Sequence, residues 1–302
     1  MTRHFLSLGD YSRAELESLF TLTKDLKKQQ KQGIAHPCLR GKSVTLIFDK
    51  SSTRTRISFE VGVYQLGAQP LFISSATSQM GRGEPIKDTA RTISRYCDGM
   101  MIRTYGQEIV EEFAHYSSVP VINGLTDKFH PCQIMADLFT VIEHKGGYQG
   151  LSYAWVGDGN NMANTWIEAA AIFGFELRLA CPEGYQPDAG VLAWARERGA
   201  RLLLTTDPQE AVAGADVLNT DVWASMGQEA EQKEREKAFA GYCLDEKLVA
   251  LARPDCLVLH CLPAHRGEEI SEAVIEGPRS VVWDEAENRL HVQKAIMATL
   301  MG

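Results

Sequence analysis

Short apolar segments alternate with helix-like segments along the whole chain of 302 residues. Each apolar segment has the length of a strand and is rich in Val, Ile and Leu. Strands that are apolar throughout and separated by helices are typical of parallel sheets with helices on both faces. The pattern therefore predicts an α/β protein. The candidate strands are 43–49, 70–74, 99–103, 119–123, 151–157, 175–181, 201–207, 216–222 and 256–262.

Helical signals fill the intervals between these strands. Ser12 and Glu15 form a predicted capping box for a helix at 11–32. The polar stretch 226–238 is either a charged helix or a loop. The other candidate helices are 51–67, 86–96, 107–117, 131–146, 161–174, 191–199 and 289–301.

The alternation of strands and helices restarts after GGYQG at 146–150. This restart predicts two doubly wound parallel-sheet domains joined by interdomain helices. The first domain would span 1–146 and the second 147–288. We expect the C-terminal helix, 289–302, to pack back on the first domain.

Composition excludes several classes of protein. The chain has 31 Lys and Arg against 39 Asp and Glu, a net charge of −8, so we expect no nucleic-acid partner. No apolar run approaches the roughly 18–20 residues that cross a bilayer, and the N-terminus lacks a signal-peptide core, so we expect no membrane association. Seven scattered cysteines indicate reduced thiols and a cytoplasmic protein.

The motif SSTRTR (51–56) opens the second helix, in which Ile57, Val61 and Tyr64 recur at helical spacing. A helix N-terminus presents unpaired N–H groups and the positive end of the helix dipole. Hydroxyls can donate hydrogen bonds to an anion, and Arg54 can bind phosphate with two of its N–H groups. Helix capping alone would explain one hydroxyl residue, so we predict a phosphate site. The other arginine of the motif, at 56, faces elsewhere and is expected to be structural.

Two further motifs carry candidate donors. His130 and Gln133 lie in the first turn of the helix that starts at Pro131, where both can reach one ligand. Arg103 ends a strand, and ligands of open α/β sheets bind at strand carboxyl ends. Taken alone, His130 is better explained as a helix cap, Gln133 as a surface residue and Arg103 as a surface arginine. The anion motif at 51–56 weakens this explanation for His130.

GDGNNM (157–162) follows a strand and imitates a dinucleotide-binding turn, with Glu183 after the next strand. Met162 stands where the third glycine would be, and its side chain obstructs close packing of helix and strand. The dinucleotide interpretation is therefore weak. The turn still places Asn161 at a helix N-terminus in the expected ligand crevice.

TDVWASMG (220–227) and HCLP (260–263) follow two later strands. Asp221 can pair with a substrate ammonium, and Gly227 permits a loop over the site. As neighbours on a strand, His260 and Cys261 are expected to face opposite ways, which argues against a Cys–His nucleophile. Repeated Cys and His spacings are missing, so we expect no metal site.

SSTRTR, HPCQ, GDGNNMAN, TDVWASMG and HCLP, in this order over nearly the whole chain, resemble the aspartate/ornithine carbamoyltransferase family. The first two motifs are shared by the whole family, whereas TDVWASMG and HCLP resemble its ornithine branch. The resemblance implies carbamoyl transfer from carbamoyl phosphate to the δ-amine of L-ornithine, giving L-citrulline and phosphate without a cofactor or metal. It also implies a homotrimer in which the first domain binds carbamoyl phosphate and the second ornithine. Such an enzyme would work in arginine biosynthesis or in catabolic ATP production, and the sequence leaves both roles open.

The resemblance also assigns roles to residues. Gln79 matches a carbamoyl phosphate-binding residue that reaches into the site of a neighbouring subunit. Arg54, Arg103, His130, Asp221 and Cys261 would be catalytic. The ornithine-binding positions are matched by Asn161, Asp221, Ser225 and Met226. The other carbamoyl phosphate-binding positions are matched by Ser52, Thr53, Arg54, Thr55, Arg103, His130, Gln133, Cys261, Leu262 and Arg289.

Alternative functions remain open from the sequence alone. Another carbamoyltransferase would use putrescine, an acylated ornithine or aspartate as its amine. An NAD-dependent dehydrogenase would use the GDGNN turn, and a non-catalytic homologue would keep the fold without the reaction. An aspartate enzyme needs cations for a second carboxylate, whereas this chain offers Asp221 and Cys261.

Overall fold

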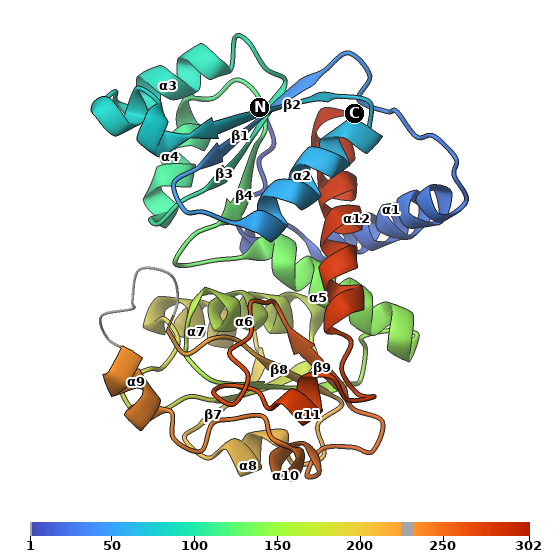
Figure 1. Cartoon of the computed structure of the whole chain (residues 1–302), viewed down its shortest axis with the longest axis vertical. Helices are drawn as coiled ribbons and strands as arrows, with labels where there is room; N and C mark the ends of the chain where they lie inside the picture. Colours follow the sequence, from blue (N-terminus) through green and yellow to red (C-terminus); the bar gives the residue numbers. More distant parts are fainter. Residues whose placement is uncertain (1, 225–231) are drawn as a thin grey trace. The chain divides into compact units, whose positions relative to one another are not determined.

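Two parallel sheets organise the structure, a computed structural model that describes residues 2–224 and 232–302 (Figure 1). The first sheet has the strand order β2-β1-β3-β4 and the second β7-β6-β5-β8-β9. Each sheet belongs to one compact unit: Met1–Ala136 with Glu287–Gly302, and Asp137–Ala286. The predicted fold class, two parallel-sheet α/β units, is confirmed.

The first unit is built from strands that alternate with helices. The strands are β1 (Ser43–Phe48), β2 (Gln69–Ser74), β3 (Gly99–Arg103) and β4 (Val121–Leu125). The helices are α1 (Arg13–Lys31), α2 (Thr53–Gln65), α3 (Ile86–Ile93), α4 (Gln107–Tyr116) and the C-terminal part of α12 (Val282–Met301). Figure 1 shows α3 and α4 on one side of this sheet and α2 on the other. Ile47, Met100 and Ile102 pack against α3 and α4.

The second unit repeats the plan with a fifth strand. The strands are β5 (Ser152–Val156), β6 (Glu176–Ala180), β7 (Arg201–Thr205), β8 (Val217–Thr220) and β9 (Leu257–His260). The helices are α6 (Asn161–Phe173), α7 (Ala189–Glu197), α8 (Pro208–Val212), α9 (Gln232–Ala238), α10 (Glu246–Val249) and α11 (Glu272–Ile275). Trp166 of α6 packs on Tyr153 of β5, whereas Ala154 and Val156 face the core formed with α8, α10 and α11.

The strand order places a switch point in each sheet. In the first sheet the chain passes from β1 to β2 on one side and returns to β3 on the other, so the loops after β1 and β3 diverge. In the second sheet the loops after β5 and β8 diverge in the same way. Ligands of doubly wound sheets bind at such points. The candidate motifs follow these strands: 51–56 after β1, Arg103 at the end of β3, 157–162 after β5 and Asp221 after β8.

The unit boundaries fall within two helices. One boundary lies in α5 (Pro131–Lys145), between Ala136 and Asp137, and the other in α12, between Ala286 and Glu287. Each of these helices therefore contributes residues to both units. In the described part of the chain, no helix combines the length and the apolar character that a membrane span requires.

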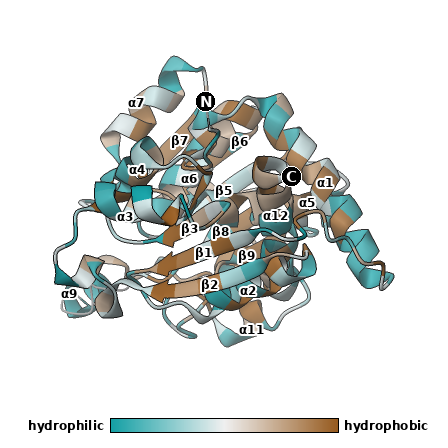
Figure 2. Cartoon of the chain, turned by 90° about the horizontal axis from the view of Figure 1, so that it is seen from above, coloured by the Kyte–Doolittle hydropathy of each residue, from teal (hydrophilic) through white to brown (hydrophobic). Residues whose placement is uncertain are grey.

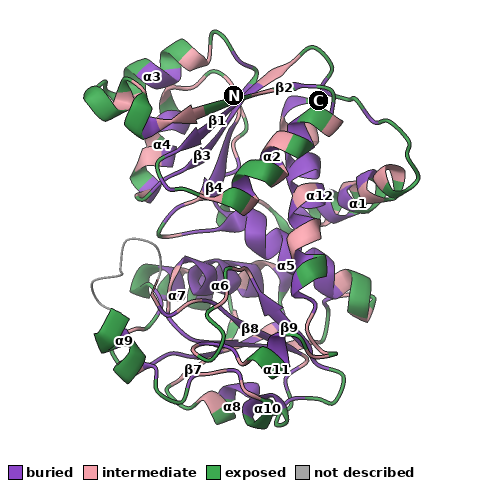
Figure 3. Cartoon of the chain, viewed as in Figure 1, coloured by how far each residue is buried: buried purple, intermediate pink, exposed green. Residues whose placement is uncertain are grey.

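The predicted strands and longer helices are present, and the capping box is confirmed: Ser12 accepts from the Glu15 N–H and the Glu15 carboxylate accepts from the Ser12 N–H. Two features differ from expectation. Helix α12 begins seven residues before the predicted start at 289. The residues that predicted α2, namely Ile57, Val61 and Tyr64, are exposed, and α2 buries Phe59 instead. Figure 3 shows exposed residues along α2 beside the buried strands β1 and β3.

Candidate active site

The N-terminus of α2 carries groups that could bind an anion. Ser52 is the N-cap, and its Oγ accepts a hydrogen bond from the Thr55 N–H at 3.2 Å. Thr53 begins the helix, which runs for 13 residues, so the dipole of a full helix points at this end. The Nε of Arg54 is buried and has no hydrogen-bond partner among the described residues. This end of the helix therefore combines a positive dipole with a guanidinium.

Thr55 accepts hydrogen bonds from two arginines that lie far from it in the sequence. Its Oγ1 accepts from Arg289 Nη2 at 2.7 Å and from Arg103 Nη1 at 3.4 Å. Thr55 is fully buried, and the two arginines are only 6% (Arg103) and 4% (Arg289) exposed. Two guanidinium groups so close together in a buried place repel each other, and a bound anion would offset that repulsion. We call Arg54, Thr55, Arg103, His130 and Arg289 the basic cluster.

His130 belongs to the basic cluster as a neutral group. The side chain is 4% exposed, and Gln133, one turn further along α5, is fully buried. Burial, with the positive charges of Arg289 and Arg103, holds the pKa of His130 well below 6.5. A neutral imidazole can donate one hydrogen bond to a carbonyl oxygen without bringing a further positive charge.

Two other predicted residues of this unit lie apart from the basic cluster. Gln79 is exposed on the loop between β2 and α3, directly before the short 3₁₀ turn Met80–Arg82. The Nε of Arg56 donates to Glu60 at 2.9 Å, and its guanidinium lies 3.7 Å from the Phe72 ring centre. Arg56 therefore has structural partners, as expected for the second arginine of the motif.

Lys50, in the loop between β1 and α2, was not among the predicted site residues. Its side chain is buried, pairs with Asp127 and lies 4.3 Å from the Tyr105 ring centre. Asp49, one residue earlier, accepts from the Thr104 hydroxyl. These contacts tie together the loops that follow β1, β3 and β4. A lysine directly before SSTRTR was the available signal.

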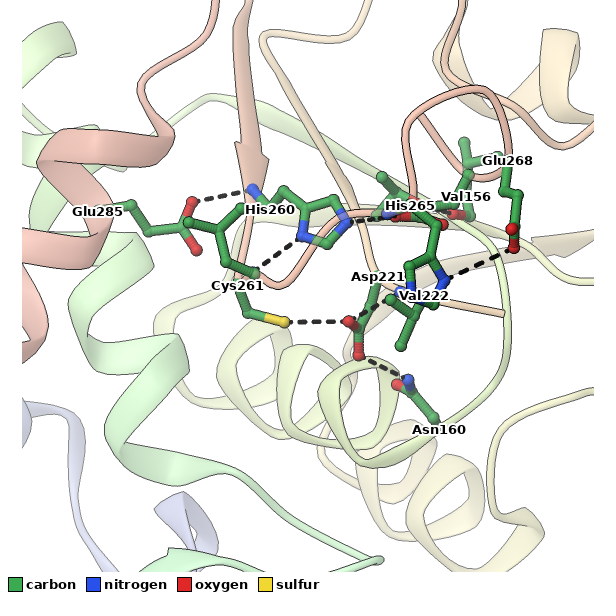
Figure 4. A network of polar contacts seen from close by, with 12 residues as sticks. Val156, Asn160, Asp221, Val222, His260, Cys261, His265, Glu268 and Glu285 are labelled. Carbon is green, nitrogen blue, oxygen red and sulfur yellow. Dashed lines mark hydrogen bonds and ion pairs between the residues drawn. The ribbon is translucent and has the colours of Figure 1, made fainter. Parts of the chain in front are cut away.

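In the second unit, Asp221 is the centre of a polar network (Figure 4). Its Oδ2 accepts from Asn160 Nδ2 at 3.0 Å. Its Oδ1 accepts from the Cys261 thiol at 3.1 Å and from the Val222 N–H at 2.8 Å. The carboxylate is 8% exposed. The loops after β5, β8 and β9 thus meet at one carboxylate, which can bind an ammonium group.

Cys261 is held as a protonated thiol. Burial raises the pKa of Cys261 well above 9.0, and the neighbouring carboxylates of Asp221 and Glu285 raise it further. A thiol donates its hydrogen to Asp221, whereas a thiolate next to this carboxylate would be repelled. Cys261 is therefore a hydrogen-bond donor here, not an activated nucleophile.

The expectation that His260 and Cys261 face opposite ways is wrong. A ring nitrogen of His260, the Cys261 sulfur and a carboxylate oxygen of Asp221 all lie within 4.8 Å of one another. Strand β9 ends at His260, so Cys261 lies outside the pleat and the alternation rule does not reach it. The turn that follows has Leu262 at φ 57°, a conformation that side chains with a Cβ rarely adopt.

Glutamates hold this turn in place. His260 Nε2 lies 3.0 Å from Glu269 Oε1, both side chains being fully buried, and the His260 main-chain N–H donates to Glu285 at 2.9 Å. His260 Nδ1 accepts from the Leu262 N–H at 2.9 Å. The second ring nitrogen must then carry the proton and donate to Glu269.

The same bonds bear on metal binding. Asp221, His260 and Cys261 offer three ligand atoms close enough for one cation, as do His265, Glu268 and Glu269. Both ring nitrogens of His260 are engaged, however, and the high pKa of Cys261 disfavours the thiolate that a metal requires. Cation binding by the first set would break these hydrogen bonds.

Asn160, which was not among the predicted site residues, caps α6. Its side-chain oxygen accepts from the Met162 N–H at 2.9 Å and the Ala163 N–H at 3.3 Å, while its Nδ2 binds Asp221. Asn161 is the buried first residue of α6. The preference of Asn for the N-cap position was the available signal. Ser225, Met226 and Gly227 lie outside the described residues.

The GDGNN turn lacks the space that a dinucleotide would need. A Cβ on Gly159 would lie 2.2 Å from the main chain of Gln186 and Pro187, so the chain itself closes on this glycine. In a dinucleotide site this glycine admits the pyrophosphate. Met162 is buried at the third position. The geometry therefore argues against the dehydrogenase alternative.

Two family profiles together match most of the chain. Residues 3–143 match the family profile "Aspartate/ornithine carbamoyltransferase, carbamoyl-P binding domain". Residues 149–300 match the profile "Aspartate/ornithine carbamoyltransferase, Asp/Orn binding domain".

Individual relatives extend the match over the full length. The chain is 77% identical to an ornithine carbamoyltransferase of Geobacter sulfurreducens, over 100% of both chains. The solved ornithine carbamoyltransferase of Pyrococcus furiosus is 49% identical, with a TM-score of 0.95 over 99% of this chain and 97% of that one. The anabolic ornithine carbamoyltransferase of Campylobacter jejuni is 42% identical, with a TM-score of 0.94 over 99% of both. The chain belongs to the aspartate/ornithine carbamoyltransferase family.

Proposed function

We propose that the chain transfers the carbamoyl group of carbamoyl phosphate to the side-chain amine of L-ornithine, giving L-citrulline and phosphate. Its high-identity relatives are ornithine carbamoyltransferases, and its N-terminal half matches a carbamoyl phosphate-binding domain. The observation that carries the proposal is the meeting of Arg103 and Arg289 on Thr55, in the first turn of α2.

The donor substrate is assigned to residues 1–146 together with Arg289 of α12. Ser52, Thr53 and Thr55 supply helix N-terminal N–H groups and hydroxyls for the phosphate, and Arg54 supplies a guanidinium. Arg103, His130, Gln133 and Arg289 are assigned to the carbamoyl end of the donor or to its bridging oxygen. The neutral state of His130 suits a donor to the carbamoyl oxygen.

The acceptor substrate is assigned to residues 147–288. The Asp221 carboxylate, fixed by Asn160 and Cys261, binds an ammonium of ornithine. Asn161, Ser225 and Met226 are assigned to the amino-acid end of ornithine from the resemblance. Cys261 and Leu262 are assigned to contacts with the carbamoyl group on the same ground.

The reaction follows from these assignments. The neutral δ-amine attacks the carbamoyl carbon, and negative charge develops on the carbonyl oxygen. Arg54, Arg103 and His130 stabilise that charge, and the loss of one such donor typically costs about 2.7–4 kcal/mol of barrier. The C–O bond to phosphate then breaks, and phosphate leaves as an anion already paired with the α2 N-terminus. The proton from the amine passes to phosphate or to solvent. No cofactor or metal takes part.

A homotrimer is the proposed assembly. The exposed side chains of Ile57, Val61 and Tyr64 on α2, with Leu71 and Phe72 on β2, form what we call the α2–β2 apolar surface. Figure 2 shows apolar residues along β2 beside α2. Apolar exposure of this extent favours burial against another chain. In such an assembly, the exposed Gln79 would serve the site of a neighbouring subunit.

The proposed setting is the cytoplasm, in arginine biosynthesis. The seven cysteines are free thiols, as suits a reducing compartment. A solved relative, from Campylobacter jejuni, is described as anabolic. Formation of citrulline from ornithine is the direction of the reaction that arginine biosynthesis would use.

A colorimetric ureido assay tests the function. Carbamoyl phosphate is supplied with ornithine, putrescine, acetylornithine or aspartate in parallel, and phosphate release is measured in the same samples. We expect ornithine to give the highest rate, with citrulline and phosphate in equal amounts. A higher rate with another amine would overturn the proposed acceptor, and phosphate release without any ureido product would overturn carbamoyl transfer.

A further inference from the structure

A buried arginine on α9 binds two loops of the second unit. Arg235 is 6% exposed, and its Nη1 donates to Asp158 Oδ2 at 2.9 Å and to the Trp223 carbonyl oxygen at 2.7 Å. Its guanidinium carbon lies 5.0 Å from the centre of the Tyr185 ring. Asp158 is itself 8% exposed, so the ion pair is formed out of contact with bulk water.

The two hydrogen bonds of Arg235 go to two loops that position Asp221. Asp158 lies two residues before Asn160, whose side chain donates to Asp221 at 3.0 Å. Trp223 lies two residues after Asp221 along the chain. One guanidinium thus fixes the loop that supplies a hydrogen bond to Asp221 and the loop that carries Asp221.

The loop of Asp158 is also fixed from its other side. The Asp158 carbonyl oxygen accepts from Trp155 Nε1 at 2.9 Å, and the Gly159 N–H donates to the Tyr185 carbonyl oxygen at 2.8 Å. These bonds hold the main chain but not the carboxylate. Arg235 is the side chain that pairs with the Asp158 carboxylate, and the Gly159 main-chain N–H also lies close to this carboxylate.

The charges of this cluster depend on the arginine. The pKa of Asp158 is raised to about 6, chiefly by burial and further by the Asp221 carboxylate, although Arg235 acts to lower it. The charge of Asp158 also raises the pKa of the buried Cys181 thiol. Without Arg235, two neighbouring buried carboxylates would lack this cation, and breaking such a pair strongly disfavours the native arrangement.

We propose that Arg235 is a positioning residue for the acceptor substrate: by holding Asp158 and the Trp223 carbonyl, it fixes Asp221 in the orientation that binds the ammonium of ornithine. The inference rests on the proposed function, because it takes Asp221 as the carboxylate that binds the ammonium of ornithine. It gives Arg235 no contact with substrate.

The test uses Arg235→Met in the full-length chain, with kcat and both KM values measured in the ureido assay. We expect the KM for ornithine to rise on the order of ten- to a hundredfold, as displacement of a substrate-binding group does. The KM for carbamoyl phosphate and the Kd for inorganic phosphate should stay within about twofold, because the basic cluster lies in the other unit. Arg235→Lys, which keeps the charge, should recover part of the ornithine affinity.

Two further variants separate positioning from general stability. Asp158→Asn should raise the KM for ornithine in the same way, and the double variant with Arg235→Met should be no worse than the more affected single one. Lys237→Met removes a positive charge from the exposed face of the same helix and should leave both KM values unchanged.

Two results would overturn the inference: an unchanged KM for ornithine in folded Arg235→Met, or a loss of kcat with both KM values moving equally. If Arg235→Met does not fold, Arg235→Lys and Asp158→Asn are read by the same criteria. A wild-type chain that makes no citrulline would overturn the proposed function itself, which is a distinguishable outcome.

Discussion

The neutral state of His130 decides what a buried histidine can do in the basic cluster. An imidazolium beside Arg103 and Arg289 would add a third positive charge to a place from which water is largely excluded. A neutral ring donates one hydrogen bond and leaves the charge on the arginines. His130 therefore suits a carbonyl oxygen as its partner, and the positive charge that stabilises the developing oxyanion comes from the arginines.

We expect His130 to stay neutral at pH 6.5, the pH at which an ordinary histidine is half protonated. The measurement is the ¹⁵N chemical shift of the imidazole in labelled protein, with His130→Gln used to assign the signal. It follows that His130 causes no loss of kcat between pH 8 and 6.5. An imidazolium pattern at pH 6.5 would contradict the burial and charge argument.

At the scale of single residues, the sequence predicted what chemistry each side chain could perform. It did not predict which side chains contact one another. SSTRTR predicted an anion site because hydroxyls, guanidinium and a helix start stand together in one segment. The contact of Thr55 with Arg289 spans 234 positions, and that of Asp158 with Arg235 spans 77. No local spacing predicts pairs of this kind, since they depend on how the strands are ordered.

The strand order is the feature of the elements that assembles the site residues. Parallel strands end at one edge of a sheet, and the switch points lie between β1 and β3 and between β5 and β8. Apolar strand patterns predicted these strands well. Helices α8, α10 and α11 were not predicted, because four or five residues do not complete enough turns to show a period.

The amphipathic pattern of α2 identified the helix but not its buried face. Buried Thr55, Phe59, Gly62 and Val63 form the inner stripe, in which only two side chains are strongly apolar. Gly62 is close to α12: a Cβ there would lie 3.2 Å from Met297 and 3.3 Å from Lys294. The close packing of α2 on α12 requires a small residue at position 62. Because glycine is not strongly apolar, the hydropathy pattern does not identify this face as buried.

Gly159 tests the close approach of the loop after β5. Gly159→Ala would place a Cβ 2.2 Å from the Gln186–Pro187 main chain, so one of the two segments must move. We expect a loss of about 1–3 kcal/mol in the free energy of unfolding, measured by denaturant titration. Gly147→Ala is the matched control, because its Cβ would meet only the flexible end of Gln149. Equal stability of the two variants would contradict the close approach.

Lys294 of α12 tests whether this part of the helix is buried as the structure shows. It is fully buried, and its Nζ donates to Gln65 at 2.8 Å and lies 3.1 Å from His36 Nε2. Burial lowers the pKa of Lys294 from 10.5 to about 8. Between these values the unfolded chain binds more protons than the folded one at this residue, so the residue's contribution to stability rises with pH.

We therefore expect the free energy of unfolding of the wild type, minus that of Lys294→Met, to increase from pH 8 to pH 10. The difference cancels the titration of groups that both proteins share. The same measurement with Lys28→Met, an exposed lysine of α1, should give a flat difference. A flat or falling difference for Lys294→Met would show that the lysine is not buried as described.

For the whole molecule, the α2–β2 apolar surface should decide assembly. We expect Val61→Glu, which places a charge on this surface, to reduce the mass measured by light scattering from that of three chains to that of one. Citrulline formation should fall with it, because Gln79 is assigned to the site of a neighbouring subunit. Glu111→Ala, a change on α4 outside this surface, should alter neither property. A wild-type monomer of full activity would contradict the proposed assembly.

The phosphate of the donor is assigned to the N-terminus of α2, and the two arginines of the SSTRTR motif test this assignment directly. Arg54→Met and Arg56→Met each replace a guanidinium while keeping an apolar stem, and kcat for citrulline formation is compared in folded protein. We predict that Arg54→Met lowers kcat on the order of 10²–10³-fold, and that Arg56→Met, whose arginine is paired with Glu60, stays within about twofold of wild type. Wild-type turnover in Arg54→Met would contradict the account.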